Sequence, residues 1–166
     1  MKKRMRFPLP VVFLLAALAV ALSAGEYKNT AGGVSLWLPD EWEIDNDELE
    51  GAIYADAPEG DAFCVLQVLV NDNDLTAALS TYSDVLSDEM DTFTVTAKGA
   101  PKEVNGLGII QIKGEGLRDE KTWTVDVQLV STGKAVLMCA LGWEKDKEET
   151  FAFLREKILP SLKALD

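Results

Sequence analysis

The side chains that could carry out chemistry in this 166-residue chain are mainly carboxylates, because it contains 28 aspartates and glutamates and no histidine. The absence of histidine removes the commonest general base, the usual Ser–His and Cys–His nucleophile pairs and the commonest zinc ligand. A pair of carboxylates can still hydrolyse a glycosidic bond if folding brings the two together. With this many acids, a solvated surface is the simpler interpretation of any chosen pair. We therefore predict a protein that is not an enzyme, and we assign no catalytic residue, cofactor or metal.

Two short motifs resemble ligand sites. The sequence Thr132-Gly133-Lys134 matches the end of a phosphate-binding loop, but Gln128 stands where that motif has its first glycine, so we exclude it. The run Asn71-Asp72-Asn73-Asp74 offers oxygen ligands of the calcium-loop type, without the glycine and the distant glutamate of an EF-hand. Helix capping by Asp74 is the favoured interpretation, and calcium binding is the alternative.

The only two cysteines are Cys64 and Cys139. Both lie in apolar segments that we expect to be central strands, in a chain that we expect to leave the reducing cytoplasm. They are a possible disulfide if their Cα atoms lie about 4.4–6.8 Å apart. Two buried free thiols are the alternative, since a thiol packs as a small hydrophobe.

An acidic segment beside two tryptophans is the candidate surface for a partner. Seven of the eleven residues from 40 to 50 are acidic, and two tryptophans stand at the near end of the segment. Aromatic groups beside charges are typical of protein interfaces. The predicted partner contact comprises Trp37, Trp42, Glu43, Asp47 and Glu48. The alternative is that the tryptophans fill the core under a solvated loop, and for Trp42 that alternative is favoured.

The first 25 residues have the layout of a secretory signal peptide. A basic head precedes the 12-residue apolar run from Val11 to Leu22, and the small residues Ser23, Ala24 and Gly25 follow. Cleavage after Ser23, Ala24 or Gly25 is compatible with this pattern. An uncleaved membrane anchor is the alternative, but a spanning helix needs about 20 apolar residues, and Pro8 and Pro10 interrupt any backward extension of the run. No cysteine near the junction could carry a lipid anchor. We therefore predict a signal peptide over residues 1–25, a single domain over residues 26–166, and a periplasmic or secreted protein without stable membrane insertion.

The charge of the mature protein argues against nucleic acid as a partner. Removing residues 1–25 takes away four of the 16 basic residues, which leaves 12 against 28 acidic ones and a net charge of −16. Such a chain is repelled by phosphate backbones and by anionic membranes.

A β-hairpin is expected between Thr122 and Trp143. Its first arm alternates between apolar and polar side chains, as a half-buried strand does, whereas its second arm is apolar from Ala135 to Leu141 and needs cover on both faces. The segment from Phe63 to Val70 is similarly apolar, so we expect these two strands to be neighbours at the sheet centre. A three-residue turn ending at a left-handed Gly133 predicts pairs between Val125 and Cys139 and between Val127 and Leu137.

Further strands are expected over residues 33–38, 52–56, 93–97 and 109–113, with a tight turn at Asn105-Gly106. Amphipathic patterns predict one helix from Asp74 to about Met90 and another from about Asp146 to Leu165, with Pro160 as a kink or break. The expected fold class is α+β, an antiparallel sheet of about six or seven strands with a helix on each face.

Two segments resemble the PsbP-like proteins. The opening from Gly33 to Trp42, GVSLWLPDEW, is similar to their strand, proline, two residues and tryptophan. The ending, an apolar strand, a helix and Ile158-Leu159-Pro160-Ser161-Leu162, is similar to that of bacterial members, including the DcrB-like envelope proteins. The resemblance implies an α/β/α sandwich used for docking rather than catalysis. Many envelope relatives look like lipoproteins, and this chain lacks their acylated cysteine.

Two functions are consistent with these observations. The favoured one is an exported, non-enzymatic binding module that acts through a protein partner in the cell envelope. The alternative is a small-ligand carrier or a carboxylate-based hydrolase with a cleft between sheet and helix.

Overall fold

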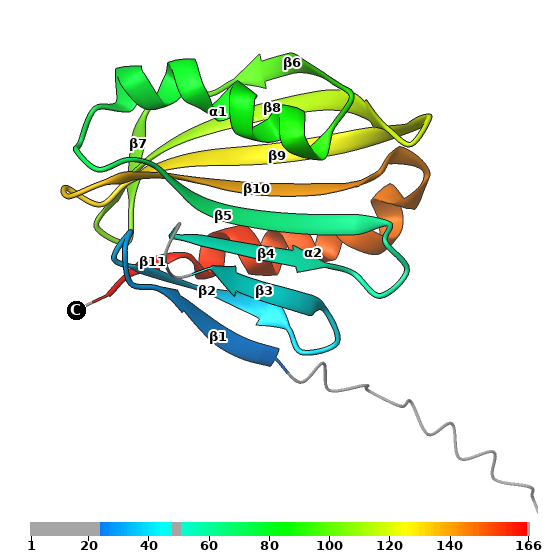
Figure 1. Ribbon diagram of the computed structural model, residues 1–166, viewed down its shortest axis with the longest axis horizontal. Helices are drawn as coiled ribbons and strands as arrows, with labels where there is room; N and C mark the ends of the chain where they lie inside the picture. Colours follow the sequence, from blue (N-terminus) through cyan, green and yellow to red (C-terminus); the bar gives the residue numbers. More distant parts are fainter. Residues whose placement is uncertain (1–23, 48–50, 166) are drawn as a thin grey trace, which may run out of the picture.

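The protein is described here by a computed structural model, which covers residues 24–47 and 51–165. Most strands belong to one antiparallel sheet with the order β3-β4-β5-β10-β9-β8-β6, in which β7 also pairs with β8 (Figure 1). Its strands are β3 (Glu43–Asp47), β4 (Ala52–Asp56), β5 (Ala62–Val70), β6 (Thr92–Lys98), β7 (Lys102–Val104), β8 (Leu107–Arg118), β9 (Lys121–Ser131) and β10 (Val136–Glu144). A second sheet of three strands, in the order β1-β2-β11, contains β1 (Ala24–Asn29), β2 (Val34–Pro39) and β11 (Lys163–Ala164).

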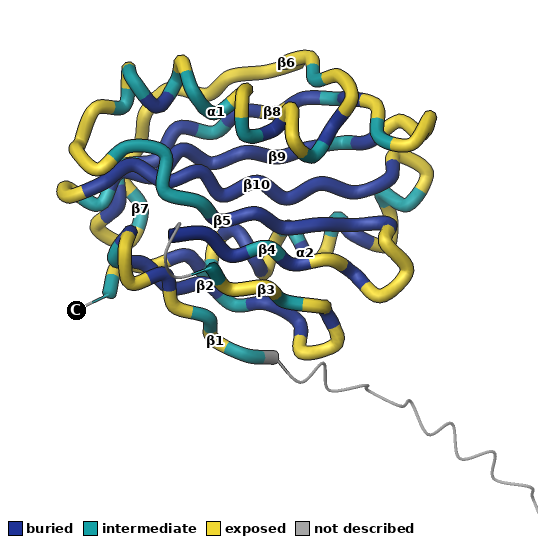
Figure 2. The backbone as a smooth tube through the Cα atoms, viewed as in Figure 1, coloured by how far each residue is buried: buried dark blue, intermediate teal, exposed yellow. Residues whose placement is uncertain are grey.

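The two apolar strands lie side by side at the centre of the large sheet, as predicted. β5 and β10 pair antiparallel along most of their length, and every residue of β10 is buried. Figure 2 shows buried residues through the middle of the sheet and exposed residues along β6 and much of β3 at its edges. An uninterrupted apolar run therefore marks the strand that is covered on both faces.

A helix lies on each face of the large sheet, which confirms the α+β class. α1 (Leu75–Glu89) packs on one face through Ala78 and Leu86, against a core that includes the alternating apolar residues of β9. α2 (Glu148–Ser161) packs on the other face through Phe151, Leu154 and Ile158, where β2 also contributes to the core. The large sheet has eight strands rather than six or seven, and β2 belongs to the separate small sheet.

The predicted register of the central hairpin is wrong by three residues. The observed pairs between β9 and β10 include Val125–Gly142, Val127–Ala140 and Gln128–Cys139. β9 continues as far as Ser131, which pairs with Val136, so four residues rather than three make the loop. The N–H of Thr132 closes that loop by donating to the carbonyl oxygen of Ala135 at 3.0 Å. Because side chains alternate along a strand, an odd shift places Cys139 on the face opposite to Val125.

Both predicted helices are present. Asp74 caps α1, because its side chain accepts hydrogen bonds from the N–H groups of Thr76 and Ala77 at 2.9 and 3.0 Å. This confirms the capping interpretation of the Asn71–Asp74 run. α2 is preceded by the short 3-10 helix η1 (Lys145–Lys147). It ends at Ser161, one residue after Pro160, and the chain continues in an extended conformation.

The predicted leader lies outside the described residues except for its last two. β1 begins at Ala24, which pairs with Pro39, and Gly25 pairs with Leu38. The small sheet therefore uses two residues that the predicted boundary assigned to the leader. Neither α1 nor α2, the longer helices of the described part, has the length and apolar character of a membrane span.

Candidate functional site

A largely apolar hollow lies beside the N-terminal half of α2, and we call it the aromatic cleft. It has a volume of about 370 Å³. Its apolar lining consists of Trp42, Ala57, Pro58, Phe151, Phe153 and Leu154. Phe153 is 41% exposed, although most large apolar side chains of the fold are buried. A hollow of this size with an exposed aromatic side chain can receive an apolar group of another molecule.

Backbone hydrogen bonds hold the walls of the aromatic cleft. The N–H of Trp42 donates to Pro39 O at 3.2 Å, which closes the turn after β2. On the facing wall, the N–H of Gly60 donates to Ala57 O at 2.8 Å in the turn between β4 and β5. Because both turns are closed in this way, the aromatic cleft is already formed without a bound partner.

Four charged residues surround the aromatic cleft: Glu41, Glu59, Asp61 and Lys147. Glu41 and Glu59 are exposed, whereas Asp61 is buried and forms an ion pair with Lys147 at 3.7 Å. Three of the four are acidic, so the rim carries a negative charge. A basic segment is the complementary partner for such a rim.

An aromatic row continues from the cleft along α2. The ammonium of Lys157 lies 4.7 Å from the ring centroid of Phe153 and 5.8 Å from that of Trp37. These distances are within the range of cation–π contacts. Trp37 is only partly buried, and its backbone N–H donates to the hydroxyl of Ser161 at 2.8 Å. The described surface therefore presents aromatic groups beside both halves of α2.

The residues predicted to contact a partner occupy different positions. Trp42 is 6% exposed and lies in the core, as favoured, while also lining the aromatic cleft. Glu43 and Asp47 lie at the two ends of the edge strand β3, where Glu43 is exposed and Asp47 is half-buried. Glu48 lies outside the described residues. The sequence analysis did not identify Phe153 as a candidate contact. A signal was present, because its spacing from the buried Phe151 and Leu154 places this aromatic residue off the apolar stripe of α2.

A second hollow, which we call the polar pocket, lies on the same side of the large sheet between α2 and strands β8 and β9. It has a volume of about 380 Å³ and is lined mainly by polar residues: Thr96, Lys113, Glu115, Thr124, Asp126, Lys145, Glu148 and Arg155. Lys145 donates to both oxygens of Glu115, at 2.8 and 2.9 Å. The other charged groups centre on Asp126, which is only 6% exposed.

Asp126 is held by ion pairs but not by a close hydrogen bond on Oδ1. Its Oδ1 lies 3.9 Å from the ammonium of Lys113, and its Oδ2 lies 3.7 Å from the guanidinium of Arg155. Both separations exceed the usual hydrogen-bond range of about 2.7–3.2 Å. Burial raises the pKa of Asp126, and the two cations oppose that effect only partly. The fold thus keeps a carboxylate in a place where its charged form is disfavoured.

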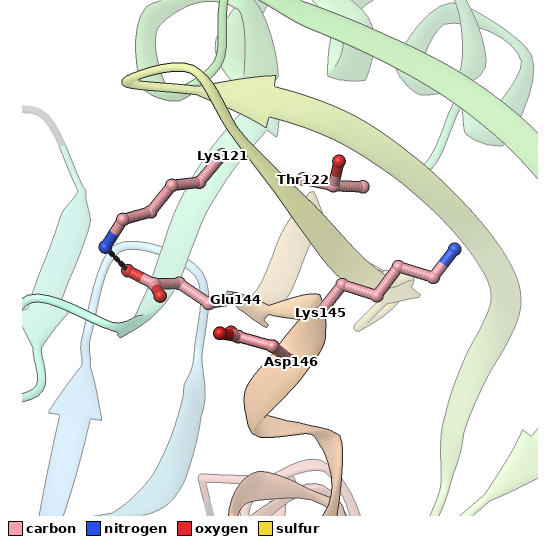
Figure 3. Close-up of a pocket in the computed structure, with 5 residues that line it drawn as sticks. All are labelled: Lys121, Thr122, Glu144, Lys145 and Asp146. Carbon is pink, nitrogen blue, oxygen red and sulfur yellow. Dashed lines mark hydrogen bonds and ion pairs between the residues drawn. The ribbon is translucent and has the colours of Figure 1, made fainter.

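A third hollow, of about 510 Å³, adjoins the polar pocket through their shared residue Lys145. Figure 3 shows the ion pair between Lys121 and Glu144 on one side of it, with the Lys145 side chain extending away from that pair. Asp146 completes the charged lining. Lys121 and Glu144 pair with each other, and Lys145 pairs with Glu115 in the polar pocket.

The two cysteines are free, buried thiols on neighbouring strands. Cys64 lies opposite Leu141 and Cys139 lies opposite Leu66, so the two are diagonal neighbours on one face. A hydrogen bond with Cys139 and burial both raise the pKa of the Cys64 thiol. Within residues 24–47 and 51–165, no cluster of three or more Cys, Asp or Glu side chains has an arrangement that could hold a metal ion.

Comparison with known proteins gives a fold and not a family. No family model matches the sequence, and no curated protein is detectably similar to it. The structure is similar to cyanobacterial PsbP (CyanoP) from Synechocystis sp. PCC 6803, with a TM-score of 0.60, 15% identity, and coverage of 86% of this chain and 93% of that one. LpqN, involved in cell envelope biogenesis of Mycobacterium tuberculosis, gives a TM-score of 0.56 and 19% identity, covering 87% of this chain and 91% of LpqN.

The Ran-binding protein Mog1p of Saccharomyces cerevisiae gives a TM-score of 0.56 at 8% identity, covering 88% of this chain and 97% of Mog1p. These similarities extend over nearly the whole described domain. The chain therefore has the PsbP-like fold that its opening and closing segments predicted.

Proposed function

We propose that this protein is an exported, non-enzymatic binding module of the cell envelope, and that the aromatic cleft is where a basic segment of a protein partner docks. The observation that carries this proposal is the preformed apolar cleft beside α2 with an acidic rim. An apolar side chain of the partner enters between Trp42 and Phe153, and a neighbouring lysine or arginine meets Glu41 and Glu59. Interface centres are built in this way, from aromatic anchors inside a polar rim.

Two of the structurally similar proteins are consistent with this use of the fold. Mog1p is a Ran-binding protein, and LpqN is involved in cell envelope biogenesis. The layout of residues 1–25 supports export of the present chain. The net charge of −16 for residues 26–166, worked out above from the sequence, favours a basic partner over an acidic one.

The proposal is tested first by crosslinking in intact cells, followed by identification of the captured protein and measurement of its affinity for the purified module. Replacing Phe153 by serine removes the exposed aromatic wall of the cleft, so we expect about a tenfold or greater loss of affinity. The matched control is Val95→Ser, because Val95 is equally exposed, at 44%, but lies on β6 at the far edge of the sheet. That variant is expected to bind normally.

The acidic rim is tested separately. The double substitution Glu41→Lys and Glu59→Lys should slow association and make it less dependent on salt, because rim charges act mainly on the rate of encounter. The control replaces two exposed acids of α1 in the same way, Asp84→Lys and Asp88→Lys, which changes the net charge equally. If Phe153→Ser and the rim variant both bind like their controls, the aromatic cleft is not the docking site.

A further inference from the structure

The polar pocket contains a buried acceptor that the protein itself leaves unused. Asp126 lines this pocket and is more than nine-tenths buried, yet its Oδ1 accepts no hydrogen bond within the described chain. The ammonium of Lys113 stands 3.9 Å from that atom. Buried polar atoms without a partner are uncommon in folded proteins, and each one suggests a strain or a function.

The next residue on the same face of β9 repeats the pattern. Gln128 is 5% exposed, and its Oε1 also lacks a hydrogen-bond partner. Thr124, Asp126 and Gln128 form the polar face of the alternating strand, and the sequence alone would place that face in water. In the structure this face lies on the side covered by α2, from which Arg155 forms an ion pair with the carboxylate of Asp126. Two acceptors on one buried face therefore lack donors.

Of the two residues, only Asp126 lines the polar pocket, and the charges around it restrict what can donate to its carboxylate. Three cations and three anions line the polar pocket: Lys113, Lys145, Arg155, Glu115, Asp126 and Glu148. Because they balance, an ionic ligand would leave one charge uncompensated in a partly buried site. A ligand ammonium beside Asp126 would also approach Lys113 and Arg155, each within 4 Å of the same carboxylate. An uncharged donor avoids both penalties.

We propose that the polar pocket binds an uncharged ligand through a primary carboxamide, whose N–H donates to Asp126 while its oxygen accepts from Arg155 or Lys113. A primary carboxamide presents one N–H and its oxygen on the same edge, so it fits between the carboxylate and the cations. A peptide-backbone amide does not, because its trans geometry points N–H and C=O in opposite directions. The carboxamide can belong to a free small molecule or to an asparagine or glutamine side chain of a peptide.

The site is tested by titrating the 15N-labelled protein with propionamide and following the amide signals of Gly114, Thr124 and Asp126, which all line the polar pocket. We expect saturable shifts at these positions. Propionate and propylammonium, which have the same size and carry a charge, should bind at least tenfold more weakly. A glutamine-containing tripeptide with acetyl and N-methylamide caps, compared with the same peptide containing methionine, tells whether a peptide side chain is preferred to the free amide. The absence of saturable shifts with both propionamide and the glutamine peptide overturns the proposal, and so does tighter binding of glycerol.

Two variants test whether the carboxamide binds at Asp126 and Arg155. Asp126→Asn should weaken propionamide binding at least tenfold, because it removes the charged acceptor. Arg155→Lys keeps the charge and the fold but loses the planar pair of donors, and it should weaken binding severalfold. The control is Glu156→Gln, an exposed neighbour on α2 that does not line the polar pocket. Unchanged binding in either pocket variant would show that the carboxamide does not sit between Asp126 and Arg155. None of these changes touches the aromatic cleft, so the result is independent of partner docking.

Discussion

The carboxylate of Glu148 makes two stabilising interactions at the start of α2, so its removal should lower the free energy of unfolding. Its Oε2 accepts a hydrogen bond from the indole N–H of Trp143 at 2.6 Å, and Trp143 has no exposed surface. Glu148 is also the first residue of α2, where a negative charge interacts favourably with the helix dipole. One side chain therefore satisfies a buried donor and stabilises the helix N-terminus.

Replacing Glu148 by alanine leaves the buried indole N–H without an acceptor, which costs about 1–3 kcal/mol. The lost charge at the helix N-terminus costs about 0.3–1 kcal/mol more. We therefore expect the free energy of unfolding to fall by about 1.3–4 kcal/mol. With a urea dependence of about 1–3 kcal/mol per molar, the unfolding midpoint should drop by roughly 1 M.

Two variants separate the two contributions. Glu149→Ala removes an exposed acid from the same first turn, so it should cost only the dipole contribution of about 0.3–1 kcal/mol. Glu148→Gln keeps an oxygen acceptor for Trp143 and should lie between the two alanine variants. The assay is urea unfolding followed by far-UV circular dichroism. Equal losses for Glu148→Ala and Glu149→Ala would show that the indole hydrogen bond contributes nothing, and would refute the reasoning.

Three further predictions concern processing, thiols and pH. Cleavage after Ser23 leaves β1 complete, so N-terminal sequencing of exported protein should give Ala24 as the first residue, and a start beyond Gly25 would contradict this. Thiol titration of unfolded, unreduced protein should find two free groups, and in the native state Cys64 should react slowly because burial and its hydrogen bond with Cys139 raise its pKa. Burial raises the pKa of Asp126 in the folded protein. The stability that its protonated form contributes is therefore fully present below the unfolded pKa of about 3.9, and it is lost as the pH rises through the folded pKa. The unfolding free energy of the wild type minus that of Asp126→Asn should therefore decrease with rising pH over that range, and an increase would contradict the assignment.

The features that the sequence predicted correctly rest on local patterns. Apolar runs, broken in β5 only by Gln67, identified β5 and β10 as covered on both faces, and a strand of that kind needs a similar neighbour. Asp74 marked the start of α1 because a side-chain oxygen at the N-cap satisfies the first free N–H groups of a helix. Asn105-Gly106 marked the turn between β7 and β8, where both residues have positive φ angles of 52° and 75°.

The features that the sequence did not predict depend on how one loop closes and on contacts between distant segments. The hairpin register failed because Gly133 fits loops of different lengths, and only the closure between Thr132 and Ala135 selects the four-residue one. The pairing of β2 with β11 was missed because β11 has two residues and pairs with β2 across most of the chain. No local pattern in residues 163–164 predicts that pairing.

The polar face of β9 shows why the candidate sites could not be found from the sequence. Alternation correctly predicted that Asp126 and Gln128 share a face, and water was the reasonable expectation for that face. α2 covers it in the structure, because the helix must also bury Phe151 and Ile158 against β2 and β10. The same placement sets Phe153 beside Trp42 on the other side of the helix. Both proposed sites therefore depend on one tertiary event, the docking of α2 on the sheet.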